Sequence, residues 1–354
     1  MKTHFIGLDT HGQFCDAVAV NNKGAVVFRG RSKTNIPALV DLLEKVPKPR
    51  HLVIEEGPLA DWLWRNLRSH VAQMIVCEPR RNRLIARDGD KDDPIDAEKL
   101  ANLFRGGFVK VVHHTDTLER ACLKQHVSLY HQQVCLRVRE GHRARSLLRQ
   151  HGILVREKDF AQAAARPELL ERLPAHRTLR ENLLLLWQSY DVAADHEDRL
   201  RKRLVALAQQ EEVVRRFEAL PGIGWVRGLT LFVWLDTPWR FPSKQALWKY
   251  LGIGLERRRS GNGPERLGVP EQVNRPLKST ILGAAKSAAA LGDNPFADLY
   301  RRWRDEGLSL RVARRNVARS LAVTLWGLWK NGSTYRPEWV GVPAAALRTV
   351  EAFG

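Results

Sequence analysis

Four carboxylates occupy positions where a fold can gather them. Asp9 and Glu55 each directly follow an apolar, strand-like run, and Asp93 and Asp96 precede a helical pattern over residues 97–104. A carboxylate at the end of a strand leaves the sheet at its edge, and two aspartates three residues apart share one face of a helix. We therefore predict that the four side chains converge on one point.

Convergent carboxylates repel one another and need cations to remain ionised together at neutral pH. Hard oxygen ligands suit Mg²⁺, with Mn²⁺ as an alternative, and such a site assists phosphodiester cleavage. Taken singly, each residue has a plainer explanation. Asp93 fits a helix N-cap, Asp96 a favourable first-turn charge, and Glu55 with Glu56 the start of a solvated turn. The ordered set in a basic protein favours the metal site.

Charge is the outlying property of the chain. Its 58 Lys and Arg residues exceed its 39 Asp and Glu residues, which gives a formal net charge of +19. A surplus of this size indicates a polyanionic partner, and nucleic acid is the leading candidate because neutralised phosphates release counterions. A merely solvated basic surface is the alternative.

Length and composition restrict the class of protein. At roughly 100–200 residues per domain, 354 residues make two or three domains. Apolar residues at 44% and charged residues at 27% exclude a disordered or fibrous chain. No apolar stretch approaches the roughly 20 residues of a membrane span. The beginning of the chain lacks the pattern of a signal peptide, and the four cysteines are scattered, so we expect a cytoplasmic protein.

Three regions follow from the patterning. Strand-like runs alternate with helical patterns over residues 1–115, which predicts a mixed α/β domain, and residues 21–24 have the chemistry of a hairpin turn. Residues 116–217 are helical. A heptad seam from Leu179 to Val214 predicts a helix of roughly 50 Å, with residues 123–148 as its partner and a bend over 156–174. This region is either a plain helical hairpin or a coiled-coil arm for dimerisation.

The third region, residues 218–354, is expected to be mostly helical, with a loop rich in Gly, Pro and Arg over 254–270. In that loop Ser260 follows Arg257, Arg258 and Arg259, and glycines at 261 and 263 allow a tight turn. Such a serine can approach a phosphate whose charge the arginines neutralise, although it needs activation to act as a nucleophile. A flexible basic loop with an incidental serine is the alternative.

Residues 220–224, Leu-Pro-Gly-Ile-Gly, open the third region. The backbone amides at Gly222 and Gly224 match a helix-hairpin-helix loop that contacts phosphates, and the segment also matches an ordinary turn between helices.

These motifs, in this order, resemble one family. It is the insertion-sequence transposase family with a RuvC-like DEDD domain and a C-terminal catalytic serine, related to the Piv-type DNA invertases and also called bridge-RNA-guided recombinases. Asp92 replaces the threonine that is common there, and Glu55-Glu56-Gly57 replaces Glu-x-Thr-Gly, where we take Glu55 as the ligand. The resemblance covers almost the whole chain. Its segments are 4–9, 52–58, 91–97, 220–224, Phe241 with 247–252, 257–263, 274–278, 294–295 and 313–318.

The resemblance implies an RNase-H-like first domain whose Asp9, Glu55, Asp93 and Asp96 bind Mg²⁺. It implies that Ser260 becomes covalently joined to DNA, within one subunit or in trans. The implied partners are target and donor DNA, a structured guide RNA and further copies of the chain, as a dimer or tetramer. The nucleic-acid contacts would come from Gly222, Gly224, Arg257, Arg258, Arg259, Arg275, Arg314 and Arg315.

Two other functions remain open. A metal-dependent nuclease, such as a junction resolvase of the same fold, would cleave with an activated water and would not need Ser260. A non-catalytic nucleic-acid-binding protein would need neither Ser260 nor Asp9.

Overall fold

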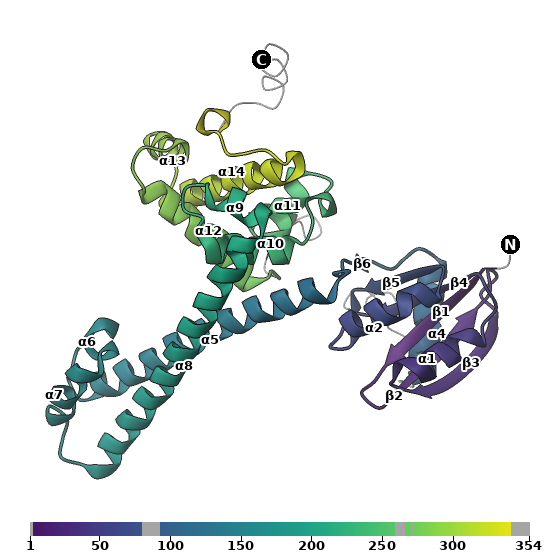
Figure 1. The fold of residues 1–354 in the computed structure, drawn as a ribbon, viewed down its shortest axis with the longest axis horizontal. Coiled ribbons are helices and arrows are strands. Elements are labelled where there is room, and N and C mark those ends of the chain that lie inside the picture. Colours follow the sequence, from purple (N-terminus) through teal and green to yellow (C-terminus); the bar gives the residue numbers. More distant parts are fainter. Residues whose placement is uncertain (1–2, 80–92, 259–265, 271, 341–354) are drawn as a thin grey trace. The chain divides into compact units, whose positions relative to one another are not determined.

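The computed structural model describes residues 3–79, 93–258, 266–270 and 272–340, without the side chains at 93, 94, 257, 258, 266 and 267. The chain divides into two compact units, Met1–Ala121 and Cys122–Gly354. Figure 1 shows the first unit as a sheet with helices, and the second as almost wholly helical. The two kinds of unit confirm the expectation of an α/β domain followed by a helical region.

The first unit is built on a six-stranded sheet in the order β3-β2-β1-β4-β5-β6. β1, β2 and β3 form an antiparallel meander, β4 pairs in parallel with β1, β5 pairs in parallel with β4, and β6 closes antiparallel. The bounds are β1 His4–Thr10, β2 Phe14–Val20, β3 Val26–Lys33, β4 Arg50–Glu55, β5 Gln73–Cys77 and β6 Val111–Val112.

The turn between β2 and β3 confirms the predicted hairpin. The Asn21 side-chain oxygen accepts hydrogen bonds from the backbone N–H groups of Lys23 and Ala25, at 2.9 and 3.1 Å. Gly24 has φ of +85°, a conformation that glycine adopts without steric cost.

Helices cover both faces of the sheet. α1 (Ile36–Glu44) and α2 (Ala60–Leu67), followed by a short 3-10 turn at Arg68–His70, pack on one face. That face carries Ile6, Leu8, Leu52 and Ile54 in the main core of the unit. α4 (Asp93–Arg105) packs on the opposite face, where Leu100 meets Val53 and Ile75.

The contact between α4 and β1 is unusually close. A Cβ atom added at Gly7 would lie 2.0 Å from the Ala97 carbonyl oxygen and 2.7 Å from the Ala101 nitrogen. The α4 backbone therefore rests directly on the β1 backbone, which only glycine permits. Arg29 of β3 also forms an ion pair with Glu98, so α4 is tied to the edge of the sheet as well.

Two long helices dominate the start of the second unit. α5 (Leu118–Gln150) and α8 (Arg177–Gln210) lie side by side, and α6 (Glu157–Ala161) and α7 (Arg166–Glu171) lie at the end of this pair (Figure 1). Buried residues of both long helices, Ala144, Leu148, Leu183 and Trp187, share one core. The pair is a helical hairpin within one chain, and the predicted bend contains the two short α-helices and a 3-10 turn at Ala163–Ala165 between them.

The predicted seam helix ends earlier than expected. Its 34 residues give roughly the predicted 50 Å, but Glu211 has an extended backbone (φ −89°, ψ 111°) and separates α8 from α9 (Glu212–Glu218). Val214 thus belongs to the next helix, whose core it joins with Phe217. In the sequence the apolar heptad spacing runs through this break without interruption, because residues on both sides of Glu211 pack against the same core.

The rest of the second unit packs helices around one large core. Side chains of Ser243, Asn274, Asn294 and Ser309 each cap the start of a helix by accepting backbone hydrogen bonds. The elements are α10 Trp225–Leu235, η3 Pro238–Arg240, α11 Lys244–Tyr250, α12 Arg275–Ala290, α13 Pro295–Asp305, α14 Leu310–Asn331 and η4 Pro337–Trp339.

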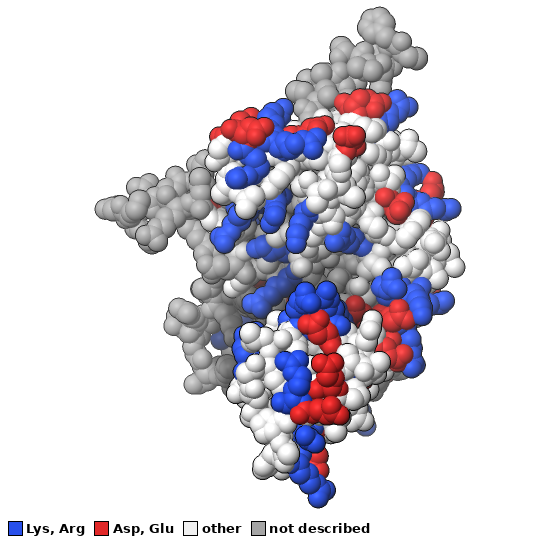
Figure 2. Space-filling view, turned by 90° about the vertical axis from the view of Figure 1, so that its left-hand side faces the viewer, with Lys and Arg blue, Asp and Glu red and all other residues white. Residues whose placement is uncertain are grey.

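The expected loop over 254–270 contains a small two-stranded sheet. β7 (Glu256–Arg258) pairs antiparallel with β8 (Arg266–Gly268), with Arg258 opposite Arg266. No described helix is both long and apolar enough to cross a membrane. Figure 2 shows Lys and Arg side chains gathered across the middle of one face of the molecule, with Asp and Glu mostly nearer its upper and lower parts.

We predict that Gly7→Ala destabilises the first unit, because the added methyl group must push the α4 backbone away from β1. The free energy of unfolding should fall by about 1–3 kcal/mol or more, measured by urea denaturation. Gly12→Ala is the matched control, since no heavy atom lies within 4 Å of a Cβ at Gly12. Equal stability of the two variants would contradict the close α4–β1 contact.

Candidate active site

Two central strands bring Asp9 and Glu55 together. In the parallel β1–β4 pair Leu8 lies opposite Ile54, so the next residues, Asp9 and Glu55, are neighbours where the strands leave the sheet. Side chains alternate between faces, and Leu8 and Ile54 face α1 and α2. Asp9 and Glu55 therefore share the face covered by α4. Both side chains are only partly buried, so a solvent-borne ligand can reach them.

The direction of α4 places its first turn at this same end of the sheet. Phe104, near the end of α4, packs against Phe5 near the start of β1, with 5.6 Å between ring centroids. Ala97 lies over Gly7, further along β1. α4 thus runs antiparallel to β1, and its first residues extend toward the strand ends that carry Asp9 and Glu55.

The two predicted helix carboxylates differ in position. Position 93 is in helical register with Ala97, Leu100 and Phe104, the positions of α4 that pack on the sheet. The Asp93 side chain lies outside the described residues. Asp96 is on the flank of the helix, with a side chain 51% exposed and an oxygen 4.0 Å from Lys99 Nζ.

The alternation of β4 also distinguishes Glu55 from Glu56. Glu55 is the last residue of the strand and follows the pattern of Val53, on the α4 side. Glu56 lies beyond the strand, is exposed, and its N–H donates to the Cys77 carbonyl. The geometry favours Glu55 as the residue that accompanies Asp9.

A divalent ion suits this donor set in chemistry, because adjacent carboxylates supply hard oxygen ligands. Among the described residues, however, no group of three or more His, Cys, Asp or Glu side chains is arranged to hold a metal ion. The structure therefore brings together Asp9 and Glu55, leaves Asp96 at the flank, and does not describe the Asp93 side chain. The four-carboxylate metal site stays a prediction.

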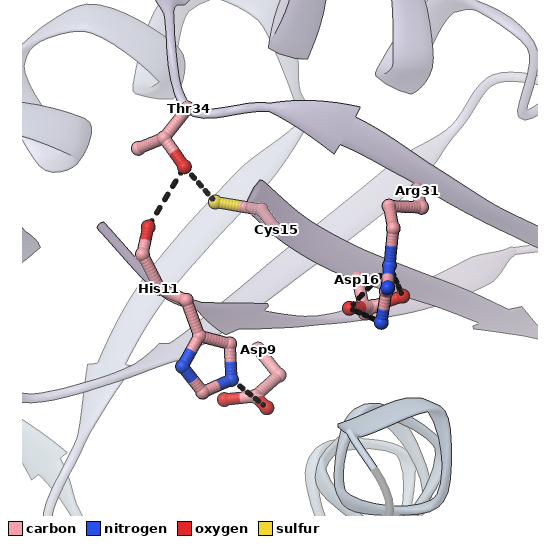
Figure 3. Close-up of polar contacts among 6 residues, drawn as sticks. All are labelled: Asp9, His11, Cys15, Asp16, Arg31 and Thr34. Carbon is pink, nitrogen blue, oxygen red and sulfur yellow. Dashed lines mark hydrogen bonds and ion pairs between the residues drawn. The ribbon is translucent and has the colours of Figure 1, made fainter. Parts of the chain in front are cut away.

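His11 contacts Asp9 directly. Its Nε2 lies 3.0 Å from Asp9 Oδ2, as Figure 3 shows. The backbone of His11 is held by Thr34, whose hydroxyl donates to the His11 carbonyl at 2.7 Å. Thr34 also contacts the Cys15 sulfur at 3.4 Å, and burial raises the pKa of that thiol, which keeps it neutral beside the carboxylates.

A further carboxylate, Asp16, stands beside Asp9. The two residues are cross-strand partners on β1 and β2, so they share one face of the sheet. Asp16 is 5% exposed and accepts two-pronged hydrogen bonds from Arg31 of β3, at 2.9–3.1 Å (Figure 3). Arg31 neutralises Asp16 and lets a second carboxylate lie next to Asp9 without unpaired charge. His11, Phe14, Asp16 and Arg31 line a hollow at this place.

Sequence reasoning gave no role to His11 and did not single out Asp16. The one available signal was Asp16 as a lone charge within the apolar run that becomes β2. Its partner Arg31 lies on another strand, and the pairing becomes visible only with the register of the sheet.

In the second unit, Gly222 has a packing role. Its φ is +81°, and a Cβ there would lie 2.3 Å from the Ala284 carbonyl oxygen of α12. Arg227 donates to the Gly222 carbonyl at 2.7 Å and to Ser287 Oγ at 2.9 Å, which fixes the turn to α12. Gly224 begins α10 without a side-chain cap and has open space around it. These residues line an open hollow, and phosphate contact there stays a prediction.

Ser260 and Arg259 lie outside the described residues, between β7 and β8. Arg257 and Arg258 lie on β7, the first strand of the hairpin that β7 forms with β8. The base of the hairpin is anchored on α14, because Arg319 donates to the Ile253 carbonyl at 2.9 Å.

The remaining residues that we predict to contact nucleic acid are arginines on helices. Arg275 begins α12, is exposed, and lines a hollow with His131 and Trp234. Arg314 and Arg315 lie on α14, exposed and half-buried, and form no ion pair with any carboxylate in the described part of the chain.

Two family models match the chain, one mainly in the first unit and one in the second. A family model for the DEDD domain of IS110 elements, described as "Transposase", matches residues 6–153. A second, described as "Transposase IS116/IS110/IS902 family", matches residues 214–301. The chain belongs to the IS110 family of insertion-sequence transposases. The first match holds Asp9, Glu55, Asp93 and Asp96, and the second holds Ser260.

One curated relative is similar over part of its length. It is the transposase for insertion sequence element IS1111A of Coxiella burnetii (strain RSA 493 / Nine Mile phase I), 23% identical over 153 residues. The match covers 41% of this chain and 40% of the relative, so it spans less than half of either protein.

We predict that Arg31→Met destabilises the first unit, because it leaves the buried Asp16 carboxylate without its partner. The expected loss is about 1–3 kcal/mol in free energy of unfolding, measured in urea at neutral pH. The double variant Asp16→Asn/Arg31→Met should recover much of this loss, since no charge is then left unpaired. Additive losses would show that the two residues do not stabilise each other.

A second pair of variants separates packing from nucleic-acid contact. Gly222→Ala should unfold at lower temperature, because its Cβ meets the α12 backbone. Gly224→Ala should keep its stability within about 1 kcal/mol, since the site is open. If the Gly224 amide contacts a phosphate, Gly224→Ala should bind duplex DNA more weakly in an anisotropy titration. Unchanged DNA affinity of Gly224→Ala would contradict a phosphate contact at Gly224 and would leave Gly222 with its packing role alone.

Proposed function

We propose that the protein is a DNA transposase, or site-specific recombinase, that cuts and rejoins DNA. The observation that carries the proposal is the placement of Asp9 and Glu55. They are neighbours at the ends of the two central parallel strands, and the first turn of α4, with Asp93 and Asp96, is directed toward them. Family membership and the net charge of +19 support DNA as the substrate.

We further infer that the first unit has an RNase-H-like fold. An antiparallel meander of three strands followed by two parallel strands, with helices on both faces, supports this inference. We propose residues 1–115 as the RuvC-like catalytic domain, 116–217 as a helical coiled-coil region, and 218–354 as the C-terminal transposase domain with the serine loop.

The proposed roles of the carboxylates follow from their chemistry. Asp9, Glu55, Asp93 and Asp96 would hold Mg²⁺, which supplies Lewis-acid stabilisation of charge on the scissile phosphate when bound. His11 orients the Asp9 carboxylate through the 3.0 Å contact. Arg31 keeps Asp16 neutralised, so that the negative charge available to a cation is concentrated at Asp9 and Glu55.

Ser260 is proposed as the nucleophile. Its hydroxyl oxygen forms a bond to phosphorus and loses its proton, while the bond to the leaving deoxyribose oxygen breaks and that oxygen takes up a proton. A hydroxyl of another DNA end later attacks the same phosphorus and releases the serine. Phosphodiester bonds are conserved in number, so no ATP is consumed. Arg257, Arg258 and Arg259 would neutralise the phosphate.

Partners and assembly belong to the same proposal. A structured guide RNA would pair with target and donor DNA, so that base pairing supplies most of the sequence choice. Arg275, Arg314 and Arg315 would then contact nucleic-acid backbones. This is consistent with the absence of an ion pair between these arginines and any carboxylate in the described part of the chain. Several copies of the chain would assemble, and Ser260 would act within one copy or between copies.

Two variants test the chemistry. Asp9→Asn should reduce DNA strand exchange by at least about a hundredfold, because it removes a negative charge beside Glu55. Ser260→Ala should abolish exchange and the protein–DNA adduct seen on denaturing gels. Chelation of divalent cations should abolish both. The assay uses full-length protein purified with its co-purifying RNA, and Asp305→Asn and Ser279→Ala, at exposed helix positions, serve as controls.

Each alternative has its own outcome. Metal-dependent cutting that survives Ser260→Ala, without an adduct, would identify a nuclease that uses water. Absence of any strand exchange or cutting by the wild-type protein, with DNA binding unchanged in Asp9→Asn and Ser260→Ala, would identify a binding protein without catalysis. Either result rejects the serine recombinase.

A further inference from the structure

One tryptophan of the second unit, Trp239, leaves most of its side chain exposed to solvent instead of packing it in the core. Trp239, in the short helix η3, has 72% of its surface accessible. A large, solvent-exposed aromatic ring indicates a binding site when its backbone is anchored and a positive charge lies beside it. Both conditions hold for Trp239.

The backbone around Trp239 is anchored. Trp326 of α14 donates its indole N–H to the Pro238 carbonyl at 2.7 Å. The Thr237 side chain accepts a hydrogen bond from the Trp239 backbone N–H. η3 is thereby attached to α14 on one side of the ring. Little conformational freedom is left for a ligand to remove on binding.

A lysine joins the two tryptophans. Lys330 Nζ lies 3.8 Å from the ring centroid of Trp326 and 5.3 Å from that of Trp239. Lys330 is in the last turn of α14, where the helix dipole favours a positive charge. In the described part of the chain it forms no ion pair with a carboxylate. Its charge is therefore available to an anion beside the exposed ring.

We propose that Trp239 and Lys330 form a binding site for an unpaired nucleotide of a single-stranded nucleic acid. A nucleobase stacks on the face of Trp239, and the adjoining phosphate contacts Lys330. Bases within a duplex are already stacked and present only their edges, so a ring face selects unpaired bases. Stacking of this kind tolerates any sequence, because every base has a π face.

This site extends the proposed function, on which it rests for the presence of a nucleic-acid partner. It adds a contact that recognises unpaired bases by stacking. The arginines of the proposed function, by contrast, neutralise the phosphates of the nucleic-acid backbone. The strand comes from DNA or from RNA, since both offer the same base face and phosphate.

Binding of labelled oligonucleotides tests the proposal. The probes are oligothymidylate and oligouridylate of about 16 nucleotides, followed by anisotropy with the full-length protein. Trp239→Ala should weaken the affinity for at least one probe roughly tenfold, and Trp239→Phe, which keeps a stacking face, should restore most of it. Which probe responds identifies DNA, RNA or both as the source. Affinity for a duplex of equal length should stay within about twofold of wild type.

Lys330→Gln should lower the slope of log affinity against log salt for the same probes by about 0.7, as expected for one lost phosphate contact. Phe108→Ala, which removes another exposed aromatic ring, is the matched control and should leave affinity unchanged. Trp239 is exposed, so the thermal stability of its variants should match wild type and exclude misfolding.

Three results overturn the proposal. The first is wild-type affinity of Trp239→Ala for both probes. The second is an equal loss in Trp239→Ala and Trp239→Phe. The third is loss of an oligomeric form with unchanged oligonucleotide affinity, which would make the ring a protein contact. Failure of the proposed function appears differently, as strand exchange that survives Asp9→Asn, because the Trp239 assay measures binding only.

Discussion

The close contact between α4 and β1 is the constraint on which the rest of the first unit depends. Because Gly7 has no side chain, the backbone of α4 settles on the sheet near Ala97 and Ala101. That contact fixes the height and direction of the helix, and with them the position of its first turn above the strand ends. The parallel pairing of β1 and β4 is enough to make Asp9 and Glu55 neighbours. The position of Asp93 and Asp96 relative to these two residues depends on the close contact at Gly7.

In the second unit, too, a glycine allows two backbone segments to pack closely. Gly222 allows the turn before α10 to lie against the α12 backbone, and Arg227 bonds both sides of that contact. Arg319 then links α14 to the segment that leads into β7. α14 thus holds the segment that leads into β7, the last strand before Ser260 in the sequence. In both units a glycine permits close backbone packing, and a charged side chain secures the neighbouring segment.

The sequence was sufficient for features that depend on local patterns. The strands β1 to β5, the turn at Asn21–Gly24 and the long helices follow from apolar periodicity and turn chemistry, whereas β6, β7 and β8 were not predicted. The family resemblance was correct. The helix break at Glu211 was missed because the apolar spacing runs through it. Asp16 was missed because its role depends on Arg31, fifteen residues away, and on strand register. Such pairings are properties of the folded sheet, which periodicity along the chain does not encode.

The outer strand β3 has a consequence for association between copies. It lies at the edge of the sheet and pairs only with β2 among the described strands. Arg29, Arg31 and Lys33 alternate along it, and the first two are held by Glu98 and Asp16. Charged residues along a free edge discourage another chain from adding a strand. Addition of a strand from another copy at β3, and aggregation by that route, are therefore disfavoured.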